Sequence, residues 1–593
     1  MTPPTSSSAA PAAGTDTTHE RVRTRATPRG RQLDADAERA VADLLGGRPR
    51  SRDALIEHLH AIQDHFGHLS LNHMHALAAW MRLPMAEVFE TASFYAHFDL
   101  VRDDETPPPA LTIRICDGLP CQLAGAAHLK AALEGALDPS SVRILRAPCM
   151  GQCDCAPAAQ IGHRTLGHAT PERVRATLAP GGAAPEHPPW QRLESYRAEG
   201  GHALLEALRT GALEATHIEH LLRDAGLRGM GGAGFPTWRK WQAVRAEAGP
   251  RYVVINADEG EPGTFKDRHY LERWPHQVLE GALVSAQALE AEAVYLYLRD
   301  EYAALHTVLR EAIAELEQAG ITRPGFIVLR RGAGAYICGE ESALIESLEG
   351  KPGKPRHRPP FVAQHGLFGR PTLVNNVETL YWIPLLHAKG AAWFASQGRH
   401  GRSGLRSFSV SGRVNKPGVH VAPAGITLRE LIDEHCGGMA AGHRLLAWLP
   451  GGASGGILPA SKADLPLDFD TLQPHGCFIG SAAVVVISDQ DDLRAAVQNL
   501  LAFFADESCG QCTPCRLGTG KMLGLIERDQ WDVSQLQGLA QLMQDASICG
   551  LGQAAPNPVL SLLRFFPDEL SRRGVRLIHT APATQAGHEE DAR

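Results

Sequence analysis

The fold of this chain is decided by two neighbouring stretches, GLRGMGGAGFPTWRKW at residues 226–241 and VVINADEGEPGTF at residues 253–265. Five glycines fall within residues 226–234, the glycine-rich loop, so backbone N–H groups there can approach a ligand closely. The apolar run at residues 252–255 predicts a buried strand. It presents the polar residues 256–261 at its carboxyl end, the edge at which open α/β sheets bind ligands. We therefore expect the two stretches to form one binding pocket.

The spacing of the glycines formally matches a dinucleotide-binding sequence motif. Gly229, Gly231 and Gly234 satisfy G-x-G-x-x-G, a motif that requires a strand before it and a helix after it. Residues 218–225 have the apolar spacing of a helix instead, and Pro236 follows the motif closely. The loop is therefore not an ordinary Rossmann turn, although its backbone amides can still cradle a phosphorylated ligand.

Composition excludes several classes of protein. The 593 residues are enough for several domains, and a hydrophobic content of 44% is enough for packed cores. The net charge of −8 argues against nucleic-acid binding, and no apolar run reaches the roughly 20 residues of a membrane span. The amino-terminal residues lack the apolar core of a secretory signal. Twelve cysteines without such a signal predict metal or redox chemistry in the cytoplasm.

Two pairs of cysteines follow two predicted strands, at residues 111–115 and 142–145. Loops at the ends of neighbouring strands can bring four thiolates to one metal centre. The C-x4-C and C-x3-C spacings are wider than the C-x2-C pairs of zinc sites and favour a [2Fe–2S] cluster. Cys155 lies just beyond the last of these cysteines and competes as the fourth ligand. The four expected ligands are Cys116, Cys121, Cys149 and Cys153.

A second group of cysteines, near the carboxyl end, is the clearest metal signal in the sequence. A C-x2-C-x2-C run follows a predicted helix at residues 493–506, and a fourth cysteine comes much later. The pattern resembles [4Fe–4S] ligation, although the proline after the fourth cysteine of bacterial ferredoxins is absent. A zinc site is the alternative, and it would make the chain a zinc-stapled assembly subunit. The expected ligands are Cys509, Cys512, Cys515 and Cys549.

Two further stretches carry polar residues that suit a ligand pocket. RGAGAYICGEESALIESLEGK, at residues 331–351, places Gly339 before a predicted helix. Glu340 and Glu341 can simply complement the helix dipole there. The stretch PTLVNNVET follows at residues 371–379.

The spacing of apolar residues changes along the chain. Residues 36–103 have helical spacing, and strands alternate with helices through residues 252–329, which predicts a mostly parallel sheet. Residues 405–488 carry short β-like runs and glycine-rich turns, which predict a small β-rich domain without assignable chemistry. Residues 179–189, APGGAAPEHPP, are typical of a linker. The chain is therefore expected to fold as a multidomain α/β protein.

These motifs, in this order, resemble the NADH-oxidising module of the complex I family. Residues 200–575 are similar to its flavoprotein subunit, and residues 36–178 are similar to its thioredoxin-like [2Fe–2S] subunit, here fused in front. The resemblance implies an FMN domain that is Rossmann-like. The implied domains are a disordered tail (1–35), a helical bundle (36–105), a thioredoxin-like [2Fe–2S] domain (106–178), a linker (179–199), an FMN- and NAD-binding domain (200–400), a ubiquitin-like domain of SLBB type (401–490), a helical [4Fe–4S] domain (491–573) and a disordered tail (574–593).

In this family the glycine-rich loop and the Asn-Ala-Asp-Glu segment hold FMN, and NAD(H) stacks over the flavin. The flavin performs the hydride transfer, so no side chain is expected to be a catalytic acid or base. Lys is frequent in the family where this chain has Arg358, and the two side chains differ in geometry. The resemblance assigns FMN to Gly229, Gly231, Gly232, Lys240, Asn256, Asp258, Glu259, Gly339, Glu340, Asn375, Asn376 and Thr379. It assigns NAD to Phe235, Glu261, Glu341, Arg358 and Phe361.

More narrowly, the fusion of both units with intact cysteines is similar to the β subunits of soluble NAD-dependent formate dehydrogenases of the molybdenum or tungsten type. The supporting stretches are ETASFYAHF (90–98), ESCGQCTPCR (507–516) and DASICGLGQAA (545–555). This resemblance implies a separate catalytic subunit with further iron–sulfur clusters, from which electrons reach NAD+ through the clusters and FMN. The alternatives are the diaphorase subunit of an NAD-reducing nickel–iron hydrogenase and a fused NADH-dehydrogenase module of complex I.

Overall fold

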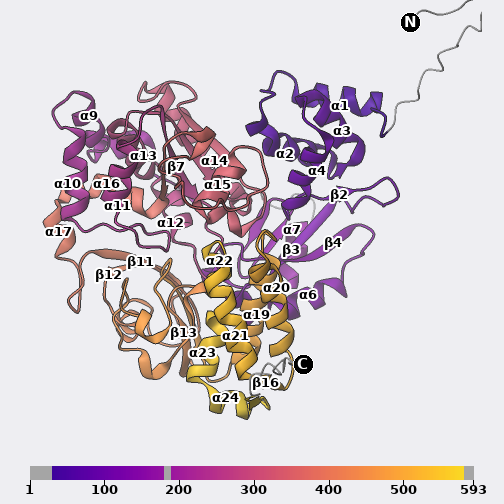
Figure 1. The fold of residues 1–593 in the computed structure, drawn as a ribbon, viewed down its shortest axis with the longest axis vertical. Coiled ribbons are helices and arrows are strands. Elements are labelled where there is room, and N and C mark those ends of the chain that lie inside the picture. Colours follow the sequence, from indigo (N-terminus) through magenta and orange to yellow (C-terminus); the bar gives the residue numbers. More distant parts are fainter. Residues whose placement is uncertain (1–29, 179–187, 580–593) are drawn as a thin grey trace, which may run out of the picture.

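The computed structural model describes residues 30–178 and 188–579 of the chain. Its five units confirm the multidomain α/β class, and most of the predicted tails, at residues 1–29 and 580–593, lie outside the described part. In that part, no helix is both long enough and apolar enough to cross a membrane. The units are an N-terminal bundle (30–105), a thioredoxin-like unit (106–178), a central unit (188–400), a β-rich unit (401–490) and a C-terminal bundle (491–579) (Figure 1).

The N-terminal bundle forms because its helices bury their apolar faces together. Asp34 caps the first helix by accepting a hydrogen bond from the N–H of Ala37, and Ser70 caps the third in the same way. Val41 and Leu59 lie in the shared core. The elements are α1 (Ala35–Leu45), α2 (Leu55–Phe66), β1 (Leu69–Ser70), α3 (Leu71–Met81), α4 (Met85–Phe94) and β2 (Leu100–Val101).

The thioredoxin-like unit is a four-stranded sheet in the order β4-β3-β5-β6. Its strands β3 and β4 are parallel, with Cys116 opposite Ala147 at their ends. The loops that follow both strands therefore leave the sheet at one edge, as the cysteine pairs predict. The elements are β3 (Leu111–Cys116), α5 (Leu119–Leu123), α6 (Ala126–Glu134), β4 (Val142–Ala147), β5 (Ala159–Ile161), β6 (Arg164–Leu166) and α7 (Pro171–Leu178).

The central unit is built on a parallel sheet in the order β10-β7-β8-β9, as the alternation of strands and helices predicts. Along β7, Val253 and Ile255 face one core, while Val254 faces a second core that the N-terminal bundle shares. Burial of both faces explains the continuous apolar run of this strand. The strands are β7 (Arg251–Ala257), β8 (Ala291–Leu298), β9 (Ile327–Arg331) and β10 (Thr372–Asn376). The helices are α9 (Ala203–Arg209), α10 (Ala215–Asp224), α11 (Thr237–Arg245), α12 (Lys266–Arg273), α13 (Pro275–Ala288), α14 (Ala303–Gln318), α15 (Glu341–Leu348), α16 (Val377–Lys389) and α17 (Ala391–Ala395).

The linker predicted at residues 179–199 is wrong for its second half. Helix α8 (Leu193–Ala198) packs against α13 and α14. Trp190, Leu193 and Tyr196 are buried there, and the burial of these apolar side chains holds the segment in place. The proline- and glycine-rich composition that suggested a linker ends before them, and its first residues, 179–187, lie outside the described part.

The β-rich unit contains a mixed sheet in the order β12-β11-β15-β13-β14, and its predicted β-rich character is confirmed. Thr427 and Glu430 form a capping box at the start of its helix α18. The elements are β11 (Leu405–Gly412), β12 (Gly418–Pro423), α18 (Leu428–Glu430), β13 (Leu445–Leu449), β14 (Leu458–Pro459) and β15 (Ala483–Ser488).

The C-terminal bundle holds the second group of cysteines. The disordered tail predicted from residue 574 is wrong for its first residues, because β17 (Arg576–Ile578) pairs in parallel with β16 (Gln530–Asp532). Trp531 and Val575 are buried beside this pair and stabilise it. The helices are α19 (Leu493–Asp506), α20 (Thr513–Ile526), α21 (Val533–Ala546), α22 (Gly550–Ala554), α23 (Asn557–Phe565) and α24 (Pro567–Arg572).

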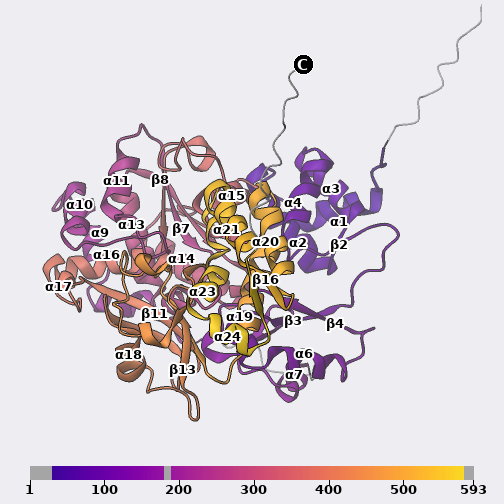
Figure 2. The same cartoon turned by 60° about the horizontal axis from the view of Figure 1, so that its bottom comes forward.

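Three units meet at one short 3-10 turn, η3 (Asp300–Tyr302), which follows β8. His97 of the N-terminal bundle pairs with Asp300, and the ring of Tyr302 lies against Gly151 of the thioredoxin-like unit. Figures 1 and 2 show the indigo helices and the purple strands side by side against the central unit. This junction brings the first cysteine group next to the strand ends of the central sheet.

Candidate functional site

The candidate cleft lies at the carboxyl edge of the central sheet. β7 and β10 are parallel neighbours, and Asn256 stands opposite Asn376 at their ends. The side-chain amide of Asn256 donates to the carbonyl oxygen of Gly339 at 2.9 Å, which joins the start of α15 to the same edge. The structure therefore brings together residues from three of the predicted stretches.

The glycine-rich loop lies against the start of α16. The N–H of Met230 donates to Oγ1 of Thr379 at 2.9 Å, and the N–H of Gly229 donates to the carbonyl of Phe235 at 2.8 Å. A Cβ added at Gly231 would lie 3.2 Å from Cβ of Asn376. A side chain at this position would therefore crowd Asn376, at the start of α16, and would have to displace it by a few tenths of an ångström.

Two buried polar atoms in the cleft are suited to a polar ligand. Oδ2 of Asp258 and Nδ2 of Asn375 are buried and have no hydrogen-bond partner among the described residues. Burial raises the pKa of the Asp258 carboxyl well above its ordinary value. A flavin carries both donors and acceptors. The Asp258 carboxyl can accept or, when protonated, donate, and the Asn375 amide can donate, so these groups beside a glycine cradle are suited to FMN.

Charged side chains of the cleft pair with one another. Nζ of Lys240 lies 3.0 Å from Oε2 of Glu341 and 3.2 Å from the carbonyl oxygen of Val374. Arg358 pairs with Glu340 and lies 3.5 Å from Oε1 of Glu341. Burial opposes the ionisation of Glu341, but Lys240 and Arg358 outweigh it, and the pKa of this carboxyl is lowered. Glu341 is therefore ionised at neutral pH, and Lys240 is available to an anionic ligand only in competition with it.

Two aromatic side chains stay open to solvent in this region. Phe235 is 50% exposed and Phe361 is 52% exposed, which is unusual for phenylalanine in a folded protein. Both belong to the predicted NAD contacts. Exposed rings of this kind suit the stacking of a planar ligand group.

Two of the predicted FMN residues use their carboxylates to cap helices. Glu259 accepts from the N–H groups of Asp267 and Arg268, at 2.8 and 3.1 Å, and from the hydroxyl of Tyr302 at 2.9 Å. Glu340 is the N-cap of α15 and accepts from two of its N–H groups. These carboxylates therefore have structural partners, which the sequence motif alone did not indicate.

Glu261, a predicted NAD contact, connects the cleft with the second cysteine group. It accepts from the N–H of Ser454 at 2.7 Å and from the hydroxyl of Tyr336. The backbone N–H of Tyr336 in turn donates to Glu507 at 2.9 Å, two residues before Cys509. Sequence patterns did not single out Tyr336, Ser454 or Glu507. Tyr336 and Glu507 lie inside the quoted stretches 331–351 and 507–516. Their contacts join separate units, so no local pattern marks them.

Lys266 was also not predicted. It follows the acidic stretch directly and is only 1% exposed. Its ammonium lies 2.8 Å from Asp267, 3.1 Å from Glu378 and 3.3 Å from Oδ1 of Asn376. This network of charged groups holds the side chain of Asn376 in place. In the sequence, the only sign of it was a Lys-Asp pair directly after Phe265.

The first cysteine group converges in the structure. Sγ of Cys149 lies 3.4 Å from Sγ of Cys153, and the thiol of Cys116 contacts those of Cys121 and Cys149. Cys155 turns away, with Sγ 3.2 Å from Oε1 of Gln152. The arrangement favours Cys153 over Cys155 as the fourth ligand. Four buried thiols are a suitable donor set for a [2Fe–2S] cluster.

The second group gathers where helices begin. Cys512 precedes the first residue of α20, and Cys549 precedes the first residue of α22. Cys515 contacts Cys512, and both Cys509 and Cys515 lie within electrostatic range of Cys549. This set suits a [4Fe–4S] cluster. Across residues 30–178 and 188–579, no three His, Cys, Asp or Glu side chains are spaced to hold a single metal ion.

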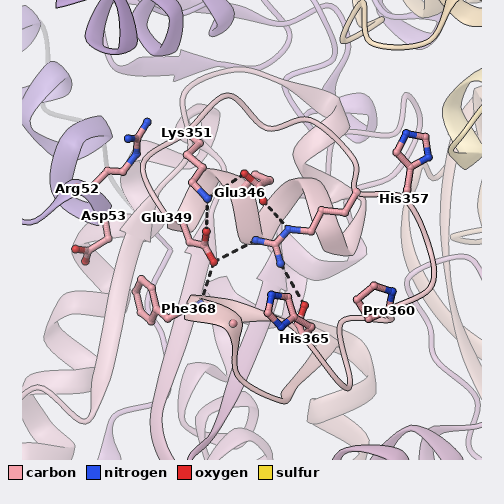
Figure 3. A pocket seen from close by; sticks show the side chains of 11 residues that line it. Arg52, Asp53, Glu346, Glu349, Lys351, His357, Pro360, His365 and Phe368 are labelled. Atoms are coloured by element: carbon pink, nitrogen blue, oxygen red, sulfur yellow. Dashed lines mark hydrogen bonds and ion pairs between the residues drawn. The ribbon is translucent and has the colours of Figure 1, made fainter. Parts of the chain in front are cut away.

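A hollow of about 810 Å³ lies elsewhere, where the N-terminal bundle meets the central unit (Figure 3). Its charges satisfy one another: Arg356 pairs with Glu346 and Glu349, and Lys351 lies 2.6 Å from Glu349. The exposed ring of Phe368 forms part of its wall. Because none of the predicted FMN, NAD or cysteine residues lines it, we take the glycine-rich cleft as the functional site.

Family models match the chain in the order of its units. The model described as the Nuo51 FMN-binding domain matches residues 222–385, and the thioredoxin-like [2Fe-2S] ferredoxin matches residues 41–180. The NADH-ubiquinone oxidoreductase-F iron-sulfur binding region matches residues 495–573, and the SLBB domain matches residues 407–458. The matches confirm the predicted FMN, [2Fe–2S] and [4Fe–4S] cofactors.

Individual proteins are similar over long parts of the chain. An NADH-quinone oxidoreductase subunit of Rhizobium meliloti (strain 1021) is 44% identical over 393 residues, which cover 64% of this chain and 93% of that protein. Mitochondrial NADH dehydrogenase [ubiquinone] flavoprotein 1 of Dictyostelium discoideum is 44% identical over 368 residues, 59% of this chain and 77% of that protein. A crystal structure of NAD+-reducing [NiFe]-hydrogenase in the H2-reduced state has a TM-score of 0.77 and 34% identity, and the match covers 88% of this chain and 93% of that chain.

Proposed function

Because this chain belongs to the family of the 51 kDa flavoprotein of complex I, we propose that it works as a diaphorase between NAD(H) and a partner chain. It is an oxidoreductase subunit with an FMN-binding domain, a [2Fe–2S] domain and a [4Fe–4S] region. The observation that carries the proposal is the glycine-rich cleft, because hydrogen bonds connect it to the segments that carry both cysteine groups. One route runs through Glu261, Tyr336 and Glu507.

The residues of the cleft would hold FMN. The amides of Gly231 and Gly232 and the ammonium of Lys240 are suited to its phosphate, and Gly229 shapes the loop through its own N–H bond to Phe235. The unpaired atoms of Asp258 and Asn375 are suited to the polar groups of the flavin. FMN, when bound, supplies the exchange between one two-electron transfer and two single-electron transfers. The side chains bind and orient, and none is proposed as an acid or a base.

The exposed rings of Phe235 and Phe361 would clamp the nicotinamide cofactor over the flavin. The ionised carboxylate of Glu341 would repel the additional phosphate of NADP and so favour NAD. Arg358 and Lys240 moderate this repulsion because both lie close to Glu341.

The two groups of thiols, the first fully buried and the second partly buried, would hold the clusters. Cys116, Cys121, Cys149 and Cys153 are proposed for the [2Fe–2S] cluster, and Cys509, Cys512, Cys515 and Cys549 for the [4Fe–4S] cluster. Electrons from a partner would enter at the C-terminal bundle, and the [2Fe–2S] cluster would be a side carrier.

For the partner we propose a formate dehydrogenase catalytic subunit of the molybdenum or tungsten pterin type, with further iron–sulfur clusters. The support is the resemblance of residues 90–98, 507–516 and 545–555 to the β subunits of those enzymes. A hydrogenase partner is the second candidate. Its support is the NAD+-reducing [NiFe]-hydrogenase structure, because the similarity spans 88% of this chain.

The diaphorase proposal is tested on the purified chain. We expect bound FMN, oxidation of NADH with an artificial acceptor, and roughly six irons if both clusters assemble. Stoichiometric zinc without flavin would overturn the proposal in favour of a zinc-stapled assembly subunit.

The partner is tested on the intact complex from its source. The proposal expects NAD+ reduction that depends on formate and a co-purifying chain with a pterin cofactor. Reduction that depends on hydrogen, with a nickel-containing chain, would replace formate with the second candidate.

A further inference from the structure

A buried arginine of the central unit donates a hydrogen bond to the cysteine loop of the thioredoxin-like unit. Nη2 of Arg299 donates to the carbonyl oxygen of Cys149 at 2.6 Å, and its Nη1 donates to the carbonyl oxygen of Glu259. Arg299 follows β8 and is only 4% exposed. One guanidinium therefore ties a proposed [2Fe–2S] ligand to the segment that forms the FMN cleft.

Three further contacts from the central unit enclose the same loop. The N–H of Gly263 hydrogen-bonds the thiol of Cys153, and the ring of Phe265 packs against Cys149 and Cys153. A Cβ added at Gly151 would lie 2.2 Å from the hydroxyl oxygen of Tyr302, so this loop approaches the central unit closely. Much of the environment of these two thiols is thus supplied by another unit.

The guanidinium of Arg299 brings a buried positive charge to the cysteine loop. It contacts the Cys149 backbone directly, while the carboxylate of Glu301 pairs with the same Nη2 atom at 2.7 Å. Charges act strongly in a buried site of low dielectric. Iron–sulfur potentials depend on net charge, on hydrogen bonds and on exposure, and reduction adds one negative charge.

We propose that Arg299 is a positioning residue for the [2Fe–2S] cluster, which it docks against the FMN segment and whose reduction potential it raises. The inference rests on the proposed function, because it takes Cys149 and Cys153 as ligands of that cluster. It assigns to the flavoprotein part of the chain a role in setting the potential of a cluster that a different unit binds.

The test is a reductive titration of the full-length protein, followed by the electron paramagnetic resonance signal of the [2Fe–2S] cluster. Arg299→Gln removes the charge and leaves the carboxylate of Glu301 without its arginine partner. We expect at least a tenfold smaller equilibrium constant for one-electron reduction, about 59 mV lower in midpoint potential. Arg299→Lys keeps the charge and should stay near the wild-type potential.

A double variant separates the loss of the charge of Arg299 from the damage that an unpaired buried charge would cause. Arg299→Gln with Glu301→Gln removes the pair without leaving a buried unpaired charge, and we expect a smaller decrease than in Arg299→Gln alone. Arg268→Lys is the matched control, because Arg268 joins the same two units through the side chain of Asp154, at 2.7 Å. Its potential should remain unchanged.

The outcomes separate the two proposals. A wild-type protein without a [2Fe–2S] signal contradicts the proposed function. If the wild-type protein shows the signal, and both Arg299→Gln and the double variant keep the wild-type potential, the role of Arg299 is overturned. The diaphorase proposal then stays intact.

Discussion

Gly231 lies where the glycine-rich loop approaches Asn376 closely. Its missing side chain allows the loop to lie against Asn376, with only 3.2 Å left for a Cβ. We expect Gly231→Val to displace the loop and to raise the dissociation constant of FMN roughly tenfold, about 1.4 kcal/mol. Flavin fluorescence during dialysis measures it. Gly538→Ala is the control, because that exposed helical position has no atom within 4 Å of an added Cβ.

Lys240 supplies the cation for the proposed phosphate contact. In the structure it holds Glu341 at 3.0 Å, so a bound phosphate would replace or share this contact. A charge-assisted hydrogen bond contributes about 1.5–3 kcal/mol, so Lys240→Met should weaken FMN binding roughly 10- to 100-fold. Titration of the apoprotein with FMN checks this. Equal affinity in Lys240→Met and in the exposed control Lys389→Met would contradict the assignment.

Single residues also show where sequence motifs stop being informative. The cysteine spacings predicted both thiol groups, because ligand geometry fixes spacing along the chain. Nothing in the sequence distinguished Glu259, whose carboxylate caps α12, from Asp258, whose Oδ2 is left unpaired among the described residues. That difference is set by Asp267, Arg268 and Tyr302, which fold back onto Glu259.

At the level of elements, periodic apolar patterns predicted most of the framework. The helix expected at residues 493–506 is α19 with the same bounds, and β7 and β8 lie where apolar runs placed them. The turn η3 was not predicted, because its three polar and aromatic residues have no periodic pattern. They are buried only through contacts with two other units.

Helix α2 docks on β9 in a way that depends on pH. Nε2 of His60 lies 2.7 Å from the carbonyl oxygen of Gly332, so the neutral ring donates there. Burial lowers the pKa of His60 to about 4 from 6.5. Unfolded protein binds the proton more readily, so stability is lost as the pH falls from 6.5 through 4. The loss should be about 2 kcal/mol at pH 5.

Urea unfolding at pH 7 and pH 5 measures this contribution. His60→Gln should lose less free energy of unfolding between the two pH values than the wild type does. His65→Gln, at an exposed position of the same helix, should behave like the wild type. An unchanged pH dependence in His60→Gln would show that another group is responsible.

At the scale of the whole molecule, the units are joined by buried charges. His97 and Asp300 are both almost fully buried, and Arg331 connects Asp300 to Asp64 of the N-terminal bundle. The sequence predicted that the units exist and in which order. It could not predict their docking, because single contacts between distant residues leave no local pattern.

This junction should hold the chain together after it is cut. We expect a protein cleaved at a protease site inserted within residues 179–187 to elute as one particle in gel filtration, because the contacts of η3 remain. Asp300→Asn removes the buried carboxylate that pairs with His97 and Arg331, and the loss of one partner of a buried pair costs roughly 3–5 kcal/mol. Its two fragments should therefore separate at far lower urea concentrations. Asp529→Asn removes the ion pair of Arg494 with a carboxylate that is 86% exposed, and it should not change the elution. Separation of the wild-type fragments in dilute buffer would mean that the covalent connection, and not the junction at η3, keeps the thioredoxin-like unit beside the cleft.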